Sequence, residues 1–271
     1  MNPPAPDPGA PPRLELGADG VARITLQRPR HRNRLHGEDL AVLQTHFERL
    51  RTSSGLRVLV LTGEGQTFSA GYHLGELGAQ GAPGDAGHAA DASKGPQAFE
   101  RTVDMLEALP LPTVARLNGG VYGGAVDLAL ACDFRIGIDG MPLRMPAVRL
   151  GLHYYPSGLR RAVTRLGVAA AKRLFLLGEE VDAHTLLGMG YLDELVAPHE
   201  LDTAVAALVD ALAAGAPLAL RGMKASIDEL AAGRAHGGTL REREALCAGS
   251  ADLREGLAAY AERRAPRFEG R

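Results

Sequence analysis

Residues 118–133, which read NGGVYGGAVDLALACD, decide the fold and carry most of the candidate chemistry. They follow a short apolar run at 113–117 and predict a strand that ends in glycines and turns into a helix. N–H groups at the start of such a helix can stabilise developing negative charge. Asp127 lies one turn inside the helix among apolar neighbours, where a carboxylate is costly unless it is paired or functional. A simple tight turn, with no chemistry, is the alternative interpretation of the glycines.

The flanking sequence predicts an α/β fold. Alternating short runs at 14–26 predict a hairpin around GADG. Apolar runs predict strands at 57–62, 113–117 and 134–138, and helical spacing predicts helices at 37–51, 99–109 and 123–131. After residue 158 the pattern is helical almost throughout, with breaks near 167 and a last helix at 240–262. Strands that alternate with helices are typical of the α/β class.

Three regions follow from these patterns. Residues 1–13 are rich in proline and predict a disordered lead-in. Residues 14–200 form the α/β core, within which the Gly/Ala/Asp-rich stretch 78–95 predicts a mobile loop that walls a pocket together with the helix at 99–109. Residues 201–271 form a C-terminal helical region, which we expect to pack on a partner subunit.

Composition excludes several classes of protein. The chain has 271 residues, with 30 basic and 32 acidic side chains and a net charge of −2, which argues against a nucleic-acid partner. Two cysteines form no disulfide framework and show no metal-ligand spacing, so we expect no metal and a cytoplasmic location. No run of about 18 apolar residues occurs, so we expect no membrane span. The N-terminus has no pattern of a signal peptide.

Two further loops carry unusual residues. Residues 68–74 read FSAGYHL and follow a buried strand, and residues 145–158 read MPAVRLGLHYYPSG and precede a helix. An N–H group from the first loop, added to one from the glycine turn, would make a two-donor oxyanion hole.

These three motifs resemble those of the crotonase superfamily, the enoyl-CoA hydratase/isomerase group. The resemblance extends over nearly the whole chain and includes RPRHRNRL at 28–35 and LREGLAAYAERRAPRF at 253–268. It implies a crotonase-like spiral core of ββα units with a C-terminal helical trimerisation region, assembled as a homotrimer or a dimer of trimers. It also implies an acyl-CoA substrate, with coenzyme A as part of the substrate and no separate cofactor.

The resemblance assigns the reacting groups. The two N–H groups that hold the thioester oxygen fall at Tyr72 and Gly124, and the first of the two catalytic glutamates falls at Asp127. The second glutamate falls at Ala147, which has no proton to exchange. A positioned acid or base contributes about 10²–10⁴ in rate. We therefore expect an atypical acid/base set.

Four side chains could substitute for the missing acid or could simply wall the acyl pocket. Tyr155 is a candidate catalytic group because a tyrosine hydroxyl is a usable proton donor. His73, His153 and Tyr154 are candidate pocket residues, and for the two histidines a structural or solvent-facing role is the stronger alternative.

The resemblance also implies contacts to coenzyme A. Arginine suits phosphate because its guanidinium is bidentate and permanently charged. The candidate contacts come from the basic loop near Asn33, from the first glycine loop and from the C-terminal region: Arg30, Arg32, Arg34, Ala70, Lys224, Arg264 and Phe268.

Two hypotheses follow. The first is an acyl-CoA enzyme in which Asp127 is the acid/base or water-holding group, with hydration, isomerisation and thioester hydrolysis all open. The second is an acyl-CoA-binding protein that has lost catalysis, which the replacement at Ala147 favours and the retained Asp127 disfavours.

Overall fold

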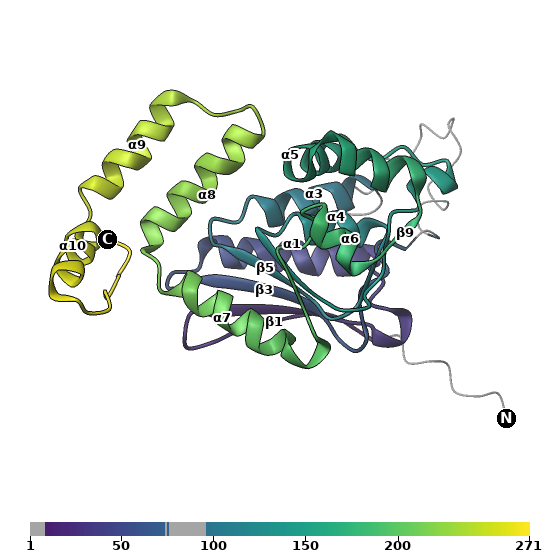
Figure 1. Cartoon of the computed structure of the whole chain (residues 1–271), viewed down its shortest axis with the longest axis horizontal. Coiled ribbons are helices and arrows are strands. Elements are labelled where there is room, and N and C mark those ends of the chain that lie inside the picture. The colour runs from purple at the N-terminus through teal and green to yellow at the C-terminus, as the bar shows by residue number, and fades with distance from the viewer. Residues whose placement is uncertain (1–8, 74, 76–95) are drawn as a thin grey trace.

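The computed structural model describes residues 9–73, 75 and 96–271, and its centre is a six-stranded sheet (Figure 1). The strand order is β1-β2-β3-β5-β7-β10. Their bounds are β1 (Ala10–Leu16), β2 (Val21–Gln27), β3 (Val58–Gly63), β5 (Thr113–Leu117), β7 (Phe134–Ile138) and β10 (Glu194–Val196). β1 and β2 form the predicted antiparallel hairpin, and every other pair is parallel.

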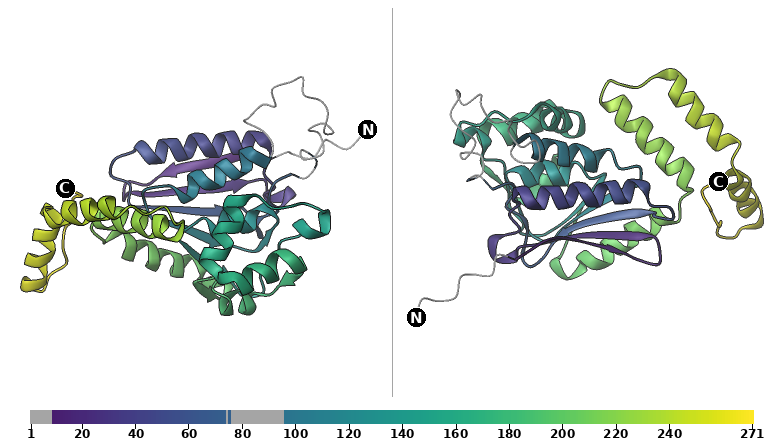
Figure 2. Two further views of the ribbon diagram at one scale, coloured as in Figure 1. Left: turned by 90° about the horizontal axis from the view of Figure 1, so that it is seen from above. Right: turned by 180° about the vertical axis from the view of Figure 1, so that it is seen from behind.

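β3 shows why this sheet is parallel and buried. All six of its residues are buried, which requires cover on both faces. Val58 and Val60 pack with helix α7 (Leu201–Ala213), whereas Leu59 and Leu61 belong to the larger core on the opposite face. That core includes the apolar face of α1 (Gly37–Thr52), and the view from behind in Figure 2 shows α1 and α7 on opposite sides of the sheet.

A second, four-stranded sheet has the order β4-β6-β8-β9. Its strands are β4 (Thr67–Ser69), β6 (Gly120–Tyr122), β8 (Leu143–Arg144) and β9 (Glu180–Val181). The chain goes from β3 to β4 and α3 (Pro96–Glu107), then from β5 to β6 and α4 (Gly124–Leu130), then from β7 to β8 and α5 (Pro156–Lys172). Each unit therefore adds one strand to each sheet and one helix, which confirms the predicted crotonase-like core of ββα units.

Irregular segments complete the core. α5 contains a non-helical residue, Gly167, with φ of 79°, at the predicted break between two helices. The remaining short elements are α6 (Ala183–Gly188), η1 (Pro29–His31), η2 (Ala147–Leu150), η3 (Arg173–Leu177) and η4 (Pro198–Glu200).

The C-terminal region is helical, as predicted. After α7 come α8 (Pro217–Ala231), α9 (Gly237–Ala248) and α10 (Ala251–Glu262), which extend from the body as an arm (Figures 1 and 2). The prediction of one helix at 240–262 was wrong. The Ser250 side chain accepts a hydrogen bond from Leu253 N and starts a new helix, because an N-cap serine satisfies a backbone donor that a helix start leaves open.

Two further observations concern the expected boundaries. β1 begins at Ala10, so residues 10–13 form a strand where a disordered lead-in was predicted, because their backbone pairs with β2. The predicted mobile loop at 78–95 lies outside the described residues.

Among the helices that the structure describes, no single one is long and apolar enough to span a membrane. Residues 198–213 and 217–231 reach that length and apolar character only when taken together, and the two helices are bent by 104° at the break between them.

Candidate active site

The two predicted oxyanion loops lie against each other. Gly71 has φ of +78°, and a Cβ atom placed on it would lie 2.6 Å from Gly124 N and 2.5 Å from the Tyr122 carbonyl oxygen. Only glycine permits this approach of two backbones. Tyr72 follows Gly71 directly, so the N–H-bearing backbone of Tyr72 and that of Gly124 meet at one place.

A cavity of about 190 Å³ opens at this meeting point. Tyr72 packs against Phe99 with ring centroids 5.8 Å apart, and Phe99 contacts the Tyr155 ring at 6.2 Å. The lining is predominantly apolar and aromatic. It comprises Ala70, Tyr72, Phe99, Tyr122, Gly123, Gly124, Met145, Pro146, Ala147, Leu150, Leu152, His153, Tyr154 and Tyr155. We call this cavity the acyl pocket.

Asp127 lies behind the acyl pocket and is not part of its lining. Its residue exposure is 1%. Arg161 Nε lies 3.0 Å from Oδ1 and Arg161 Nη2 lies 3.2 Å from Oδ2. The Tyr155 hydroxyl donates to Oδ2 at 2.5 Å. The carboxylate is therefore fully paired, and its only link to the pocket lining among these contacts is the Tyr155 hydroxyl.

Tyr154 and Tyr155 form a stacked pair at the start of α5. Their ring centroids are 4.2 Å apart, and the Tyr154 hydroxyl donates to the Tyr155 hydroxyl at 3.1 Å. Both side chains line the acyl pocket. The structure thus brings together Asp127, Tyr154 and Tyr155, which the sequence separates by 27 and 28 residues.

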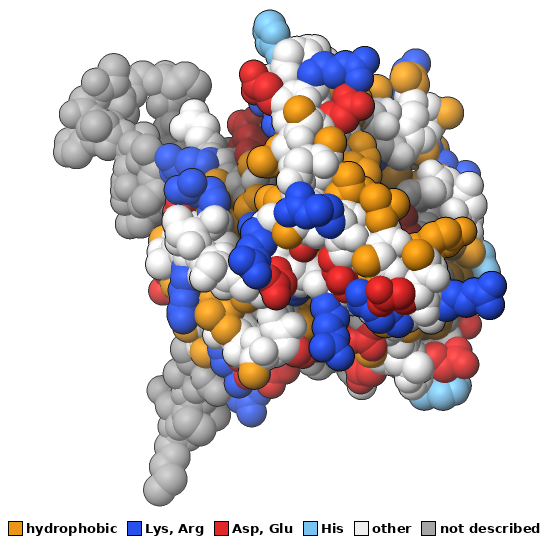
Figure 3. Space-filling view, turned by 90° about the vertical axis from the view of Figure 1, so that its left-hand side faces the viewer, with side chains coloured by type: hydrophobic (Ala, Val, Ile, Leu, Met, Phe, Trp, Pro, Cys, Tyr) orange, Lys and Arg blue, Asp and Glu red, His pale blue; other side chains and the backbone are white. Residues whose placement is uncertain are grey.

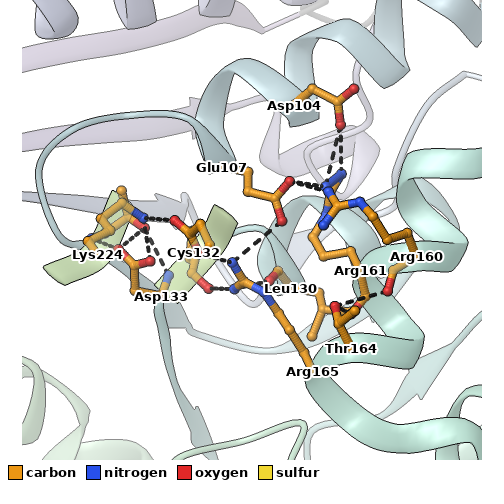
Figure 4. Close-up of polar contacts among 12 residues, drawn as sticks. Asp104, Glu107, Leu130, Cys132, Asp133, Arg160, Arg161, Thr164, Arg165 and Lys224 are labelled. Carbon is orange, nitrogen blue, oxygen red and sulfur yellow. Dashed lines mark hydrogen bonds and ion pairs between the residues drawn. The ribbon is translucent and has the colours of Figure 1, made fainter. Parts of the chain in front are cut away.

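Arg161 was not predicted as a site residue, and it organises the charges behind the pocket. Its side chain has no exposure and also contacts Glu107 at 2.8 Å and Asp104 at 3.1 Å. Figure 4 shows its guanidinium between these two carboxylates, with Arg165 one turn further along α5. Arg165 donates to the carbonyl oxygens of Leu130 and Cys132, and its Nη2 lies 3.7 Å from Glu107 Oε1 and 3.8 Å from Asp228 Oδ1.

Burial controls the ionisation of this cluster. Burial raises the pKa of Asp127 above its ordinary value, although Arg161 and the Tyr155 hydroxyl oppose the shift. Burial, and then the neighbouring Tyr154 and Asp127, raise the pKa of Tyr155 well above its ordinary value. For Glu107, burial acts in the same direction but is outweighed by Arg161 and Arg160, which lower its pKa. The Tyr155 hydroxyl is therefore protonated at neutral pH.

The other predicted pocket residues divide into two groups. Ala147 and His153 line the acyl pocket, with His153 exposed and its Nδ1 2.8 Å from the Tyr154 carbonyl oxygen. His73 is not among the lining residues; its ring packs against that of His36, with centroids 4.8 Å apart. Among residues 9–73, 75 and 96–271, no group of His, Cys, Asp or Glu side chains is arranged to hold a metal ion.

Of the predicted coenzyme A contacts, Ala70 lines the acyl pocket, and Arg30 and Arg32 are exposed on the adjoining loop. That loop meets the first of the two predicted oxyanion loops directly, because Ala70 N donates to the Arg32 carbonyl oxygen at 2.7 Å. Arg34 is half-buried, and its Nε is a buried donor with no hydrogen-bond partner in the described structure.

The remaining three predicted contacts are not part of the lining of the acyl pocket. Lys224 lines a separate polar cleft of about 460 Å³, where its ammonium contacts Asp133 and lies 3.5 Å from Asp228. On the C-terminal arm, Arg264 pairs with Glu255 at 2.6 Å, and the Phe268 carbonyl oxygen accepts from Arg57.

Comparison with known proteins agrees with this architecture. The family model for enoyl-CoA hydratase/isomerase matches residues 17–271. A carnitinyl-CoA dehydratase from Salmonella arizonae is 32% identical and covers 95% of this chain and 98% of its own. A 2,3-dehydroadipyl-CoA hydratase from Escherichia coli is 30% identical, with coverage of 93% and 96%. The crystal structure of an enoyl-CoA hydratase from Bacillus anthracis superposes with a TM-score of 0.83 at 27% identity, over 97% of this chain and 100% of the other.

The fold and these matches define a protein of the crotonase superfamily. The chain belongs to the enoyl-CoA hydratase/isomerase family.

Proposed function

We propose that this protein catalyses the reversible addition of water to the double bond of a 2-enoyl-CoA with an apolar acyl group. The observation that carries the proposal is the hydrogen bond from Tyr155, in the lining of the acyl pocket, to the buried carboxylate of Asp127. It places a group able to exchange a proton beside the juxtaposed loops of Tyr72 and Gly124.

In this proposal the backbone N–H groups of Tyr72 and Gly124 hold the thioester oxygen. The close approach of Gly71 to Gly124 N supports the assignment, because it brings the two donors to one wall of the acyl pocket. Negative charge that develops on the oxygen during water addition is stabilised there in predominantly apolar surroundings, where hydrogen-bond donors act strongly. Asp127 supplies the carboxylate of the acid/base set, and its hydrogen bond to Tyr155 connects it to the acyl pocket.

The walls of the acyl pocket favour an apolar acyl group. Phe99, Met145, Leu150 and Leu152 supply hydrocarbon surface, and transfer of apolar surface from water contributes about 25 cal/mol per Å². The coenzyme A moiety is assigned to Arg30, Arg32 and Arg34, whose guanidinium groups suit phosphates. The unpartnered Nε of Arg34 is consistent with a polar ligand at this edge.

We further propose that the protein works as a homotrimer or a dimer of trimers. Large apolar side chains are exposed along the C-terminal arm, and Figure 3 shows hydrophobic side chains among the charged ones on this face. They are Met223, Ile227, Leu230, Leu246, Leu253, Leu257 and Tyr260. A partner subunit would cover them, and the arm would carry Arg264 and Phe268 to a neighbouring site, which explains their distance from the acyl pocket here.

The second candidate function is acyl-CoA binding without turnover. It is favoured by Ala147, which offers no ionisable group, and by the complete pairing of Asp127 with Arg161 and Tyr155.

A hydration assay with crotonyl-CoA and with longer and branched enoyl-CoAs separates the two functions. Hydration is measured from the loss of the conjugated absorbance, and the affinity for each thioester is measured in parallel. We expect turnover with apolar acyl groups. Tight binding of the same thioesters with no turnover on any of them would contradict the proposal and favour the binding protein.

A further inference from the structure

The residue that lines the acyl pocket, Tyr155, is not the residue that carries the negative charge behind it, Asp127. Asp127 is 1% exposed and is absent from the lining of the acyl pocket, whereas Tyr155 lines that pocket and contacts Asp127 Oδ2 at 2.5 Å. Of the two side chains that contact the Asp127 carboxylate, Tyr155 lines the acyl pocket and Arg161 does not. Any proton that reaches the carboxylate by these contacts passes through Tyr155.

The carboxylate fixes the direction of the hydroxyl protons. An ionised carboxylate only accepts hydrogen bonds, so the Tyr155 proton points at Asp127. Tyr154 in turn donates to Tyr155 at 3.1 Å. The Tyr155 oxygen, which donates one hydrogen bond and accepts one, keeps acceptor capacity for a group in the acyl pocket. Tyr155 can therefore accept a proton from the acyl pocket while it passes its own proton to Asp127. We call the hydrogen bonds that join Tyr154, Tyr155 and Asp127 the relay.

Gly158 makes this convergence possible. A Cβ atom on Gly158 would lie 2.5 Å from Tyr154 Cε1, 2.7 Å from Tyr155 Cε2 and 2.9 Å from Asp127 Oδ2. All three distances are below any normal contact, and the neighbours are two rings and a buried carboxylate. A side chain at this position would push apart the groups that form the relay.

Arg161 holds the carboxylate end in place. Its guanidinium contacts Asp127 through two nitrogens and is itself fixed by Glu107 and Asp104. A guanidinium that forms hydrogen bonds with three carboxylates is held in one orientation, because these bonds are directional. It therefore sets which Asp127 oxygen faces Tyr155, and its charge favours the ionised form of the carboxylate.

We propose that Tyr155 is the catalytic residue that exchanges protons with the substrate, that Asp127 is its proton store, and that Arg161 is a positioning residue for Asp127. The inference rests on the proposed function and specifies its proton path. The site would hydrate an enoyl thioester with one proton relay, without a carboxylate at position 147.

The step balances with water as the only co-reactant. A water O–H bond breaks as its proton goes to the Tyr155 oxygen and the Tyr155 proton goes to Asp127. The water oxygen bonds to Cβ, and the Cα=Cβ electron pair moves toward the thioester oxygen. The enolate then takes a proton from Tyr155 at Cα, and Asp127 returns its proton to Tyr155. One water is added, and the relay is restored.

The test compares the full-length protein with five variants. Tyr155→Phe removes the relay hydroxyl, and Tyr191→Phe is its matched control because Tyr191 is a buried tyrosine whose hydroxyl donates to the Val126 carbonyl at 2.9 Å. Arg161→Gln removes the positioning charge, and Arg161→Lys keeps a positive charge there. Arg165→Gln is the control on the next turn of α5, because the contacts of Arg165 are to Leu130, Cys132, Glu107 and Asp228 and not to Asp127. Two reactions are followed: hydration of crotonyl-CoA and exchange of the α-protons of butyryl-CoA in D2O.

We expect Tyr155→Phe to lower kcat of hydration and the exchange rate by about 10²–10⁴ while KM changes little, and Tyr191→Phe to retain both rates. Loss of the Arg161 charge leaves burial of Asp127 less opposed, so its pKa rises further. Arg161→Gln should therefore shift the acidic limb of the kcat/KM profile to higher pH, and Arg161→Lys should move it back toward wild type. Arg165→Gln should leave the limb in place.

Wild-type rates in Tyr155→Phe would overturn the relay but not the proposed function. An unmoved acidic limb in both Arg161→Gln and Arg161→Lys would overturn the positioning role, even where these variants are less stable. Absence of both hydration and exchange in the wild type would overturn the proposed function together with the relay.

Discussion

The hydroxyl of Tyr155 lies 2.5 Å from Oδ2 of Asp127, although 28 residues separate the two in the chain. This contact joins helix α4, which begins at the glycine turn, to the N-cap residue of α5. It gives a carboxylate with 1% exposure a polar connection to an apolar pocket. In the proposed relay, this hydroxyl exchanges the protons that the resemblance assigns to a second glutamate, whose position is Ala147 here.

Ala147→Glu should restore a second carboxylate in the acyl pocket. Because a positioned acid or base contributes about 10²–10⁴ in rate, we expect the kcat of crotonyl-CoA hydration to rise by about 10²-fold. Ala147→Gln has nearly the same volume but does not ionise and is the matched control. Equal rates in the two variants would contradict the claim that a carboxylate at position 147 can take part in the proton exchange.

Gly158→Ala should weaken the Tyr154–Tyr155–Asp127 cluster. Overpacking of a tight core costs about 1–3 kcal/mol, and we expect the free energy of unfolding in urea to fall by this amount and kcat to fall with it. Gly188→Ala is the control, since a Cβ atom at Gly188 in α6 meets nothing within 4 Å. Equal stability of the two variants would show that the cluster tolerates the added methyl group.

Acidification should loosen the C-terminal arm. Arg264 and the Arg267 N–H lower the pKa of Glu255 to about 2. A carboxyl group whose pKa is depressed in the folded state stabilises it above the unfolded value of 4.5, and this stabilisation is lost as pH falls toward 2. We expect amide hydrogen exchange of residues 264–268 to accelerate between pH 5 and pH 3, relative to intrinsic rates, and Glu255→Gln to abolish this change. An identical pH response in the variant would contradict the assignment.

Charges on the arm should break the proposed assembly. Ile227 and Leu257 are 63% and 62% exposed in the protomer, so Ile227→Asp and Leu257→Asp are tolerated by the isolated fold. We expect the wild type to sediment as a trimer or hexamer and both variants as smaller species. Glu242→Gln, an exposed position on α9, should sediment like the wild type. A monomeric wild type would contradict the proposed role of the arm.

Much of the fold was predictable because its signals are local. The strands at 113–117 and 134–138 have the predicted bounds, since each is a short apolar run between turn residues. Gly167 interrupts α5 at the predicted break. β4, β6, β8 and β9 are too short to show periodicity, so the second sheet was not predicted from residue patterns.

The site was less predictable because its contacts are distant in sequence. Asp127 and Tyr155 were identified separately as candidates, but nothing in the sequence indicates that one hydrogen-bonds the other. Arg161 was missed: it is one of several arginines in a helix, and only the fold brings Glu107 and Asp127 to it from 54 and 34 residues away. The spacing of Arg161 and Arg165 on one helical face was the one local signal.

The most direct test of the central claim is the hydration rate of crotonyl-CoA by wild type and Asp127→Asn, which preserves the shape of the side chain and removes its negative charge. The account predicts measurable turnover by the wild type and a loss of about 10²–10⁴ in kcat in the variant, with binding of the thioester retained. Unchanged turnover in Asp127→Asn would contradict the claim that this buried carboxylate takes part in the reaction.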